Sequence, residues 1–244
     1  MTKQTDVVVR DANVKFIPVT LRVPLKFGAE TLVHITCARA SVTVEGKNGK
    51  TATGVGETPL SVPWVWPSSL AYQPREDALR EFTSILADEW STFGASGHPM
   101  EVGEDFQKQT LDNVHHKFNA ALSHEPMPHL AALVACSPYD IALHDAFGML
   151  HDVPVYETYN AKFMNRDLAD FLIDAQGSSD RFRGKYPQDF FVSQPPRQMP
   201  AWHLVGGKDP IAASELTGAE PKDGYPVLLR DWIKRDGLNC LKVK

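Results

Sequence analysis

The sequence predicts an α+β domain of antiparallel strands and helices, followed by a strand–helix–strand unit of the (β/α) type. Three observations lead to this prediction. Residues up to about 57 alternate in polarity like strands, residues from about 74 to 150 have helical periodicity, and the residues after 198 read as strand, helix and strand. Strands followed by helices are typical of an α+β domain, whereas a strand–helix–strand unit requires parallel strands.

The antiparallel part begins with two segments rich in β-branched residues, at 6–17 and 31–45. The apolar set of the second segment shifts by one residue at Cys37, which predicts a β-bulge there. Asn48-Gly49 then predicts a tight turn into a third strand at 51–57. These strands are expected to form a small antiparallel meander.

Two segments punctuated by proline, 18–28 and 58–70, are predicted to be exposed loops, because proline cannot pair in a central ladder. The second segment carries Trp64 and Trp66, which are large apolar side chains for a loop to leave in water. Two alternatives remain open for these side chains. They pack on the domain's own helices, or they line a ligand cavity.

Apolar side chains recur every three or four residues over 74–90, which predicts an amphipathic helix. The same signature is weaker over 104–122. Residues 128–150 are expected to form two helices that meet at Ser137-Pro138, with Ser137 as the N-cap of the second. The predicted boundaries are an α+β domain at 1–156, a connecting or inserted segment at 157–198, and the two strands of the last unit within 199–244.

The composition argues against several classes of protein. With 25 Lys and Arg against 30 Asp and Glu, the chain has no excess of basic residues for nucleic acid or anionic lipid. It has no 18-residue apolar stretch and no signal-peptide core at its start, so we expect a cytoplasmic protein without a membrane partner. Three well-separated cysteines argue against a disulfide framework or a thiolate zinc site.

The last predicted strand is the part of the sequence that points to chemistry. Side chains alternate along a strand, so Lys242 and Lys244 share one face and Leu241 and Val243 the other. If the apolar face contacts a covering helix, the lysines face the interior of a barrel near the carboxyl end of the strand, where such barrels hold catalytic groups. Neighbouring ammonium groups disfavour each other's charged form, which favours a lysine base. Two alternatives remain open, a merely solvated polar end and a Schiff-base lysine.

Four segments together resemble one family. They are GETPL at 56–60, SPYDIALHDAFGM at 137–149, VGG at 205–207 and LKVK at 241–244. The resemblance is to the mandelate racemase and muconate lactonizing enzyme branch of the enolase superfamily. In that family an α+β capping domain precedes a modified TIM-type (β/α) barrel, and a K-x-K pair ends the second barrel strand.

The resemblance implies roles for individual residues. Lys244 would remove the proton α to a carboxylate, and Lys242 would be its electrostatic companion. The segments 18–28 and 58–70 would determine the substrate, with Trp64, Trp66 and Phe27 as substrate-binding residues. It also implies a homo-oligomer with a small carboxylate as substrate.

The implied activity is that of a Mg²⁺-dependent lyase or isomerase. Its enediolate intermediate would lead to dehydration of an acid sugar, to racemisation or epimerisation, or to cycloisomerisation. The acidic metal ligands of the family are expected after Lys244, so residues 1–244 alone are expected to be an inactive N-terminal part of a longer enzyme. The alternative is a non-catalytic binding or oligomerisation module with the same fold.

Three other patterns are expected to be structural. His144-Asp145 lies where the family's similar Asp is structural, and the neighbours His115-His116 cannot chelate one metal from a helix. Gly54-Val55-Gly56 and Gly206-Gly207 do not open a helix as a phosphate-binding loop does.

Overall fold

The computed structural model describes residues 2–243, so the predicted base Lys244 lies outside the described residues. The chain divides into two compact units. The first unit is Met1–Ile17 with Thr36–Phe191, and the second is Pro18–Ile35 with Val192–Lys244. No helix within the described range is long and apolar enough to cross a membrane.

The first unit is built on a four-stranded sheet in the order β3-β2-β1-β4. The strands are β1 (Val7–Phe27), β2 (Glu30–Gly46), β3 (Thr51–Pro59) and β4 (Ser96–Gly97), and the β2–β3 and β1–β4 pairs are antiparallel. The predicted meander of three strands is therefore confirmed. Strands β1 and β2 continue into the second unit as a hairpin.

The predicted loop at 18–28 is wrong, because β1 continues through Pro18 and Pro24 to Phe27. Strand β4 pairs with β1 only at Val7 and Val8, so the rest of β1 has a strand neighbour on one side only, at β2. The open side of such an edge strand needs no ladder partner, and proline is tolerated there. The sequence pattern alone does not distinguish this edge position from a loop.

The bulge predicted near Cys37 is not found on the β3 side of β2, since the ladder between β2 and β3 runs without interruption from Cys37–Pro59 to Glu45–Thr51. Alternate residues of β2 from Ala38 to Val44 are buried against the core, whereas Val33, of the opposite phase, is 49% exposed. The shift in the apolar pattern therefore marks the passage from one compact unit to the other.

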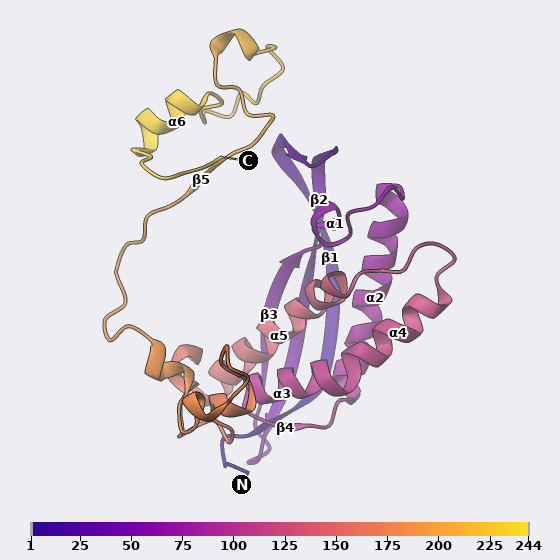
Figure 1. Ribbon diagram of the computed structural model, residues 1–244, viewed down its shortest axis with the longest axis vertical. Coiled ribbons are helices and arrows are strands. Elements are labelled where there is room, and N and C mark those ends of the chain that lie inside the picture. Colours follow the sequence, from indigo (N-terminus) through magenta and orange to yellow (C-terminus); the bar gives the residue numbers. More distant parts are fainter. Residues whose placement is uncertain (1, 244) are drawn as a thin grey trace. The chain divides into compact units, whose positions relative to one another are not determined.

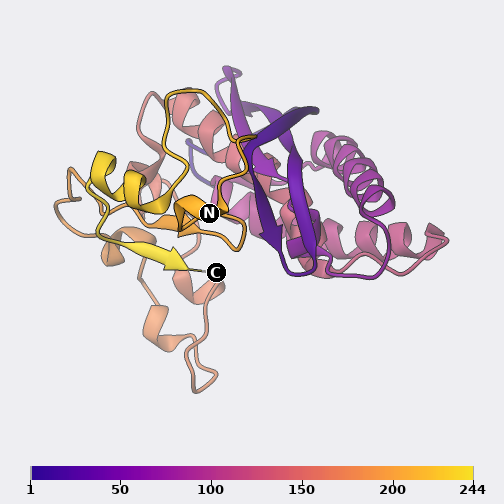
Figure 2. The ribbon, with the colours of Figure 1, turned by 90° about the horizontal axis from the view of Figure 1, so that it is seen from above.

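Helices cover one face of this sheet, and α2 and α4 lie on the same side of it (Figures 1 and 2). The helices are α1 (Val62–Val65), α2 (Tyr72–Thr92), α3 (Pro99–Phe106), α4 (Asp112–Ala121) and α5 (His129–His151), with a π-helical turn at Gln107–Leu111 between α3 and α4. The core joins the buried face of β2 to the apolar sides of these helices. Within it, Trp90 stacks on Phe106 with ring centroids 3.8 Å apart.

Helix α5 is one continuous helix with Pro138 inside it, so the prediction of two helices with Ser137 as N-cap is wrong. Proline at this position deprives the carbonyl of Val134 of its usual N–H donor. The Ser137 hydroxyl donates to that carbonyl at 2.8 Å and replaces the missing bond. The helix continues because its own side chain satisfies the group that proline leaves unpaired.

The Gly-Val-Gly pattern of β3 lets α5 lie directly on the strand. A Cβ atom built on Gly54 would lie 2.2 Å from the backbone nitrogen of Ala146, and one on Gly56 would lie 2.2 Å from the carbonyl oxygen of Pro138. No side chain fits at such a distance. The two glycines therefore serve close packing between strand and helix, in agreement with the expectation that they form no phosphate-binding loop.

The segment after α5, which belongs to the first unit up to Phe191, contains short 3₁₀ turns and is held to α3 by buried polar groups. The turns are Val155–Thr158, Leu168–Asp170, Asp180–Phe182 and Pro187–Phe190. The buried Glu101 carboxylate accepts hydrogen bonds from the backbone nitrogens of Asn165 and Arg166, at 2.5 and 2.7 Å. These bonds attach the segment to the start of α3.

The second unit contains the strand–helix–strand motif that the sequence predicts. Strands β5 (His203–Val205) and β6 (Leu241–Val243) are parallel, and α6 (Leu229–Asp236) lies between them in sequence. A long connection with one 3₁₀ turn, Ala213–Glu215, separates β5 from α6. The prediction of an α+β part followed by a parallel strand pair is therefore confirmed.

Candidate functional site

The candidate site lies in the second unit, at the carboxyl end of β5. Val205 pairs with Val243 in the parallel register, and β5 leads directly into Gly206 and Gly207. Parallel strands end at the same edge of a sheet, and α/β barrels bind ligands at that edge. The polar groups at this edge are therefore the first candidates for ligand binding.

Two cavities open beside this edge. One, of about 470 Å³, is lined by Lys26, Phe27, Gly28 and Gly207. The other, of about 540 Å³, lies between the β1 residues Arg22–Pro24 and the connection that follows β5. Both volumes fall in the range of small-molecule sites.

The carboxylates of the larger cavity are engaged by the chain's own backbone. Asp209 accepts from the backbone nitrogen of Gly206 at 2.7 Å, and Glu215 accepts from those of Ile211 and Ala212 at 2.8 and 2.7 Å. The two bonds to Glu215 lower the pKa of its carboxyl group. Lys208 lines the same cavity, and no residue within 2–243 forms an ion pair with it. An ammonium group is thus available to a ligand, while these acidic groups stabilise turns.

Of the predicted site residues, Phe27 and Lys242 lie in the second unit. Phe27 is half-buried and lines the smaller cavity. Lys242 is exposed on β6, and its register partner is Leu204. Val243 is 75% exposed, so the expectation that the apolar side chains of this strand contact a helix is not met there. The role of Lys242 remains a prediction.

Trp64 and Trp66 lie in the first unit, in and just after α1. Trp66 is 1% exposed, its ring nitrogen donates to Glu125 at 2.8 Å, and its carbonyl accepts from the Arg75 guanidinium at 2.6 Å. Trp64 is 50% exposed. Of the two alternatives, packing on the domain describes Trp66, whereas Trp64 presents ring surface to solvent. Substrate binding by either remains a prediction.

His144 and Asp145 point to different partners. The His144 Nδ1 atom lies 2.8 Å from the Tyr159 hydroxyl, and burial lowers the pKa of this histidine. Asp145 accepts from the backbone nitrogen of Val55 on β3 at 2.9 Å. The two neighbours therefore form no dyad, and Asp145 caps an open strand edge.

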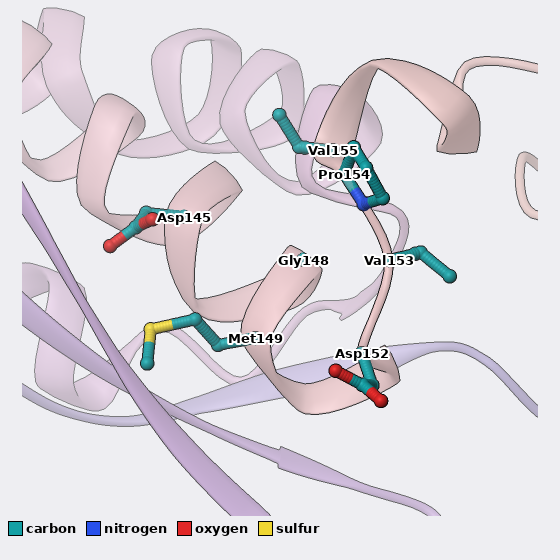
Figure 3. A pocket seen from close by; sticks show the side chains of 7 residues that line it. All are labelled: Asp145, Gly148, Met149, Asp152, Val153, Pro154 and Val155. Atoms are coloured by element: carbon teal, nitrogen blue, oxygen red, sulfur yellow. The ribbon is translucent and has the colours of Figure 1, made fainter.

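A further cavity, of about 340 Å³, lies at the last turn of α5 (Figure 3). Its polar side chains are Asp145 and Asp152, and Gly148, Met149 and residues 153–155 complete its wall. None of the predicted site residues lines it. Asp145 is already bound to the backbone of β3.

The family resemblance implies a Mg²⁺ ion, and residues 2–243 contain no suitable set of ligands for it. Within residues 2–243, no group of three or more His, Cys, Asp and Glu side chains could hold a metal ion. Mg²⁺ prefers several oxygen ligands in octahedral geometry, including carboxylates. The residues present therefore do not fit this ion.

Sequence reasoning missed the residues that join the hairpin to the connection after β5. Arg22 Nε lies 2.6 Å from Asp223 Oδ2, and Arg22 Nη2 lies 2.9 Å from Asp223 Oδ1. These residues are 201 positions apart, and no local pattern marks either of them. Lys208 follows the Gly206-Gly207 pair, which was the only nearby signal in the sequence.

Comparison with known proteins gives matches among solved structures only. No family model matches the sequence, and no curated protein matches it. One matching structure is a dipeptide epimerase from Enterococcus faecalis in complex with Mg and L-Leu-L-Tyr, at 14% identity and TM-score 0.36, covering 63% of this chain and 35% of that chain. Another is an enolase from Bradyrhizobium with magnesium and mandelic acid, at 15% identity and TM-score 0.37, covering 64% and 35%.

A third match is a mandelate racemase/muconate lactonizing enzyme-like protein from Rubrobacter xylanophilus. It has 18% identity and TM-score 0.31, and the match covers 62% of this chain and 33% of that chain. This chain thus spans about a third of the length of the structures it matches.

Proposed function

We propose that the chain is the N-terminal part of a Mg²⁺-dependent enolase-superfamily enzyme that removes the proton α to a carboxylate. One observation carries the proposal: the first three residues of the motif LKVK form β6, which runs parallel to β5, and Lys244 follows them in the sequence. A lysine at the carboxyl end of such a strand is in the usual position of a barrel enzyme's catalytic group. LKVK is also one of the four sequence segments that resemble the enolase superfamily.

In the proposed reaction, the neutral amine of Lys244 accepts the α-proton and the substrate becomes an enediolate. The charge of Lys242 disfavours protonation of its neighbour and so keeps the base available. Phe27, which lines the smaller cavity of the second unit, is proposed to contact the body of the substrate. Because residues 2–243 hold no fitting metal site, the Mg²⁺ ligands would have to follow Lys244 in a longer polypeptide.

The enediolate would then lose water, regain a proton as an epimer or racemate, or take part in a cycloisomerisation. Acid sugars and related carboxylates are the proposed substrates. The choice between these outcomes depends on groups across the substrate from Lys244. We also propose that the enzyme is a homo-oligomer, as the family resemblance implies, and that it is cytoplasmic.

The first test is the intact mass of the protein purified from its source. The proposal expects a mass well above the 27.1 kDa of these residues. The second test incubates that protein with Mg²⁺ and a panel of acid sugars, mandelate and dipeptides in D₂O. Proton NMR should show exchange of the α-proton of at least one compound.

Lys244→Ala should reduce the exchange rate at least about 100-fold, the usual contribution of a general base. Lys234→Ala, an exposed lysine on α6, is the matched control and should leave the rate unchanged. A native mass of 27.1 kDa, or exchange that survives Lys244→Ala, would reject the proposal. In the first case a non-catalytic binding or oligomerisation module is the remaining interpretation.

A further inference from the structure

Three aromatic side chains of the first unit meet at its surface, and we call them the aromatic cluster. They are Tyr156, Tyr159 and Phe191, and their ring centroids lie 6.0, 6.3 and 6.2 Å apart. Tyr156 is 72% exposed and Phe191 is 45% exposed, whereas Tyr159 is half-buried. Large apolar side chains that gather at a surface mark a candidate binding site.

The local backbone explains why these rings stand together. Tyr156 lies in the 3₁₀ turn Val155–Thr158, and Tyr159 follows that turn directly. Residues three positions apart lie on the same side of a 3₁₀ turn. Phe191 comes from a later turn, in which the backbone nitrogen of Gln188 donates to the carbonyl of Tyr159 at 3.1 Å. Two turns that are separate in sequence therefore supply the three rings.

The Tyr159 ring is held in place by groups beneath the surface. Its hydroxyl lies 2.8 Å from His144 Nδ1, and its ring contacts the ring of the buried His98 at a centroid distance of 5.4 Å. Burial raises the pKa of Tyr159 to about 12, so the hydroxyl stays protonated at neutral pH. A ring that is already fixed in one orientation loses little freedom when a ligand binds.

The three rings of the aromatic cluster do not stack on one another. The angles between their planes are 58°, 71° and 88°, so the rings are steeply inclined to one another. Because the centroids are about 6 Å apart, a nitrogen a few ångströms above the centre of their triangle is within about 6 Å of all three rings. This is the range over which a ring attracts a cation.

The chain places its own cations over other rings. Arg80 lies over the ring of Phe16 at 4.9 Å, and Lys162, which is close to the cluster in sequence, lies over Phe163 at 5.0 Å. Within residues 2–243, no Lys or Arg lies over a ring of the aromatic cluster. A cation that occupies this position therefore comes from another molecule.

Carboxylates close to the cluster favour such a cation. Glu157, between the two tyrosines in sequence, is exposed, and its side chain has no ion pair or hydrogen bond within the described part of the chain. Val155, the residue before Tyr156, belongs to the wall of the cavity at the end of α5, whose polar side chains are Asp145 and Asp152 (Figure 3). Negative charge near a ring face adds to the attraction of a cation.

We propose that the aromatic cluster binds the trimethylammonium group of a small molecule. Aromatic rings arranged around one point are suited to quaternary ammonium groups. A primary ammonium group is strongly hydrated and loses more on leaving water. The proposal does not rest on the proposed reaction, since all three rings belong to the first unit and none of them lines the two cavities of the second unit.

The test titrates the protein with choline and follows the methyl signal of choline by proton NMR. Choline should bind with a Kd of about 10 mM or lower, as expected for three exposed cation–π contacts. Its methyl signal should move upfield, because protons over a ring face are shielded. The neutral analogue of choline, with carbon in place of nitrogen, has the same shape and should bind about tenfold more weakly.

Variants of the exposed rings test the position of the site. Tyr156→Ala and Phe191→Ala should each weaken choline binding about threefold, the size of one exposed cation–π contact. Tyr156→Phe keeps the ring and should bind choline as the wild-type protein does. Phe190→Ala is the matched control, because Phe190 is 63% exposed, precedes Phe191 and contacts no ring of the cluster within the described residues.

Three results would each overturn the proposal. The first is an unchanged methyl signal at a choline concentration about tenfold above the expected Kd. The second is equal affinity for choline and its neutral analogue. The third is that both Tyr156→Ala and Phe191→Ala bind choline as well as Phe190→Ala does. Urea unfolding of each variant, with a midpoint close to that of the wild-type protein, shows that any loss of binding is local.

Discussion

Protonation of His98 should destabilise the first unit as the pH falls. His98 is fully buried at the start of α3, where its Nδ1 atom accepts from the backbone nitrogen of Met100 at 3.2 Å. The other ring nitrogen, Nε2, therefore carries the proton and donates to the Thr158 hydroxyl at 3.0 Å. A second proton would have to sit on Nδ1, facing the N–H group of Met100. The ring is thus bound in its neutral form.

The size of the effect follows from the shifted pKa. Burial, and then the neighbouring His144 and His151, lower the pKa of His98 from 6.5 to about 3. The folded state thus binds fewer protons than the unfolded state between these values, so stability is lost as the pH falls through this range. One pKa unit corresponds to 1.36 kcal/mol, which gives a loss of roughly 2 kcal/mol at pH 5.

The assay compares urea unfolding at pH 7.5 and pH 5, followed by the helical signal in circular dichroism. His98→Asn keeps an acceptor at the N-cap but cannot titrate. It loses ring packing against Phe147, whose centroid is 4.9 Å away, and is expected to be less stable at both pH values. The informative quantity is the change with pH, which should be about 2 kcal/mol smaller in His98→Asn than in the wild-type protein.

His116→Asn is the control, because His116 is exposed on α4. Its unfolding free energy should depend on pH as that of the wild-type protein does. Carboxylates far from position 98 titrate in all three proteins, so their contributions cancel in the comparison. If His98→Asn and the wild-type protein lose equal stability between the two pH values, the neutral, buried state of His98 is refuted.

Two substitutions test the packing of α5. Gly54→Ala would bring a Cβ atom to 2.2 Å from the backbone nitrogen of Ala146, and should lower the unfolding free energy by more than about 3 kcal/mol in urea titrations. An unchanged midpoint would contradict the close contact. Ser137→Ala should cost about 1 kcal/mol, because the carbonyl of Val134 loses the donor that replaces the missing N–H of proline. Ser84→Ala, at an exposed helix position where water can replace the hydroxyl, should cost less, and equal losses would argue against the special role of Ser137.

The secondary structure could be predicted where local periodicity and burial agree. The helix expected at 74–90 is α2, and the tight turn at Asn48-Gly49 joins β2 to β3 as expected. Two predictions based on proline were wrong for the same reason: the loop at 18–28 and the division of the helix at Pro138. Its local effect is to remove a hydrogen-bond donor, but the outcome depends on whether the donor was needed. At Pro24 a single neighbouring strand leaves one side of β1 open, and at Pro138 a serine replaces the donor.

The candidate site was less accessible to sequence reasoning, because its shape depends on contacts between distant segments. The parallel strands and the Gly206-Gly207 pair could be recognised from runs of a few residues. The bond between Arg22 and Asp223 joins positions 201 residues apart, and each residue alone reads as an ordinary surface charge. Trp66 presents the opposite case. The segment 58–70 was predicted to be an exposed loop, which is wrong at α1 and Trp66. Packing on the domain's own helices was one of the two alternatives left open for this tryptophan, and its ring is buried with its nitrogen bound to Glu125.

The glycines of β3 and of the turn after β5 show how one residue type serves two different structural needs. At Gly54 and Gly56 the backbone of α5 occupies the space of a side chain, so any Cβ atom is excluded. At Gly206 and Gly207 a Cβ atom would lie at an ordinary contact distance of 3.6 Å from its nearest neighbours. Close packing therefore does not require glycine after β5. The distinctive interaction after β5 is made by the backbone amide of Gly206, which donates to Asp209. This bond orients the start of the chain between β5 and α6, the same stretch in which Asp223 binds Arg22.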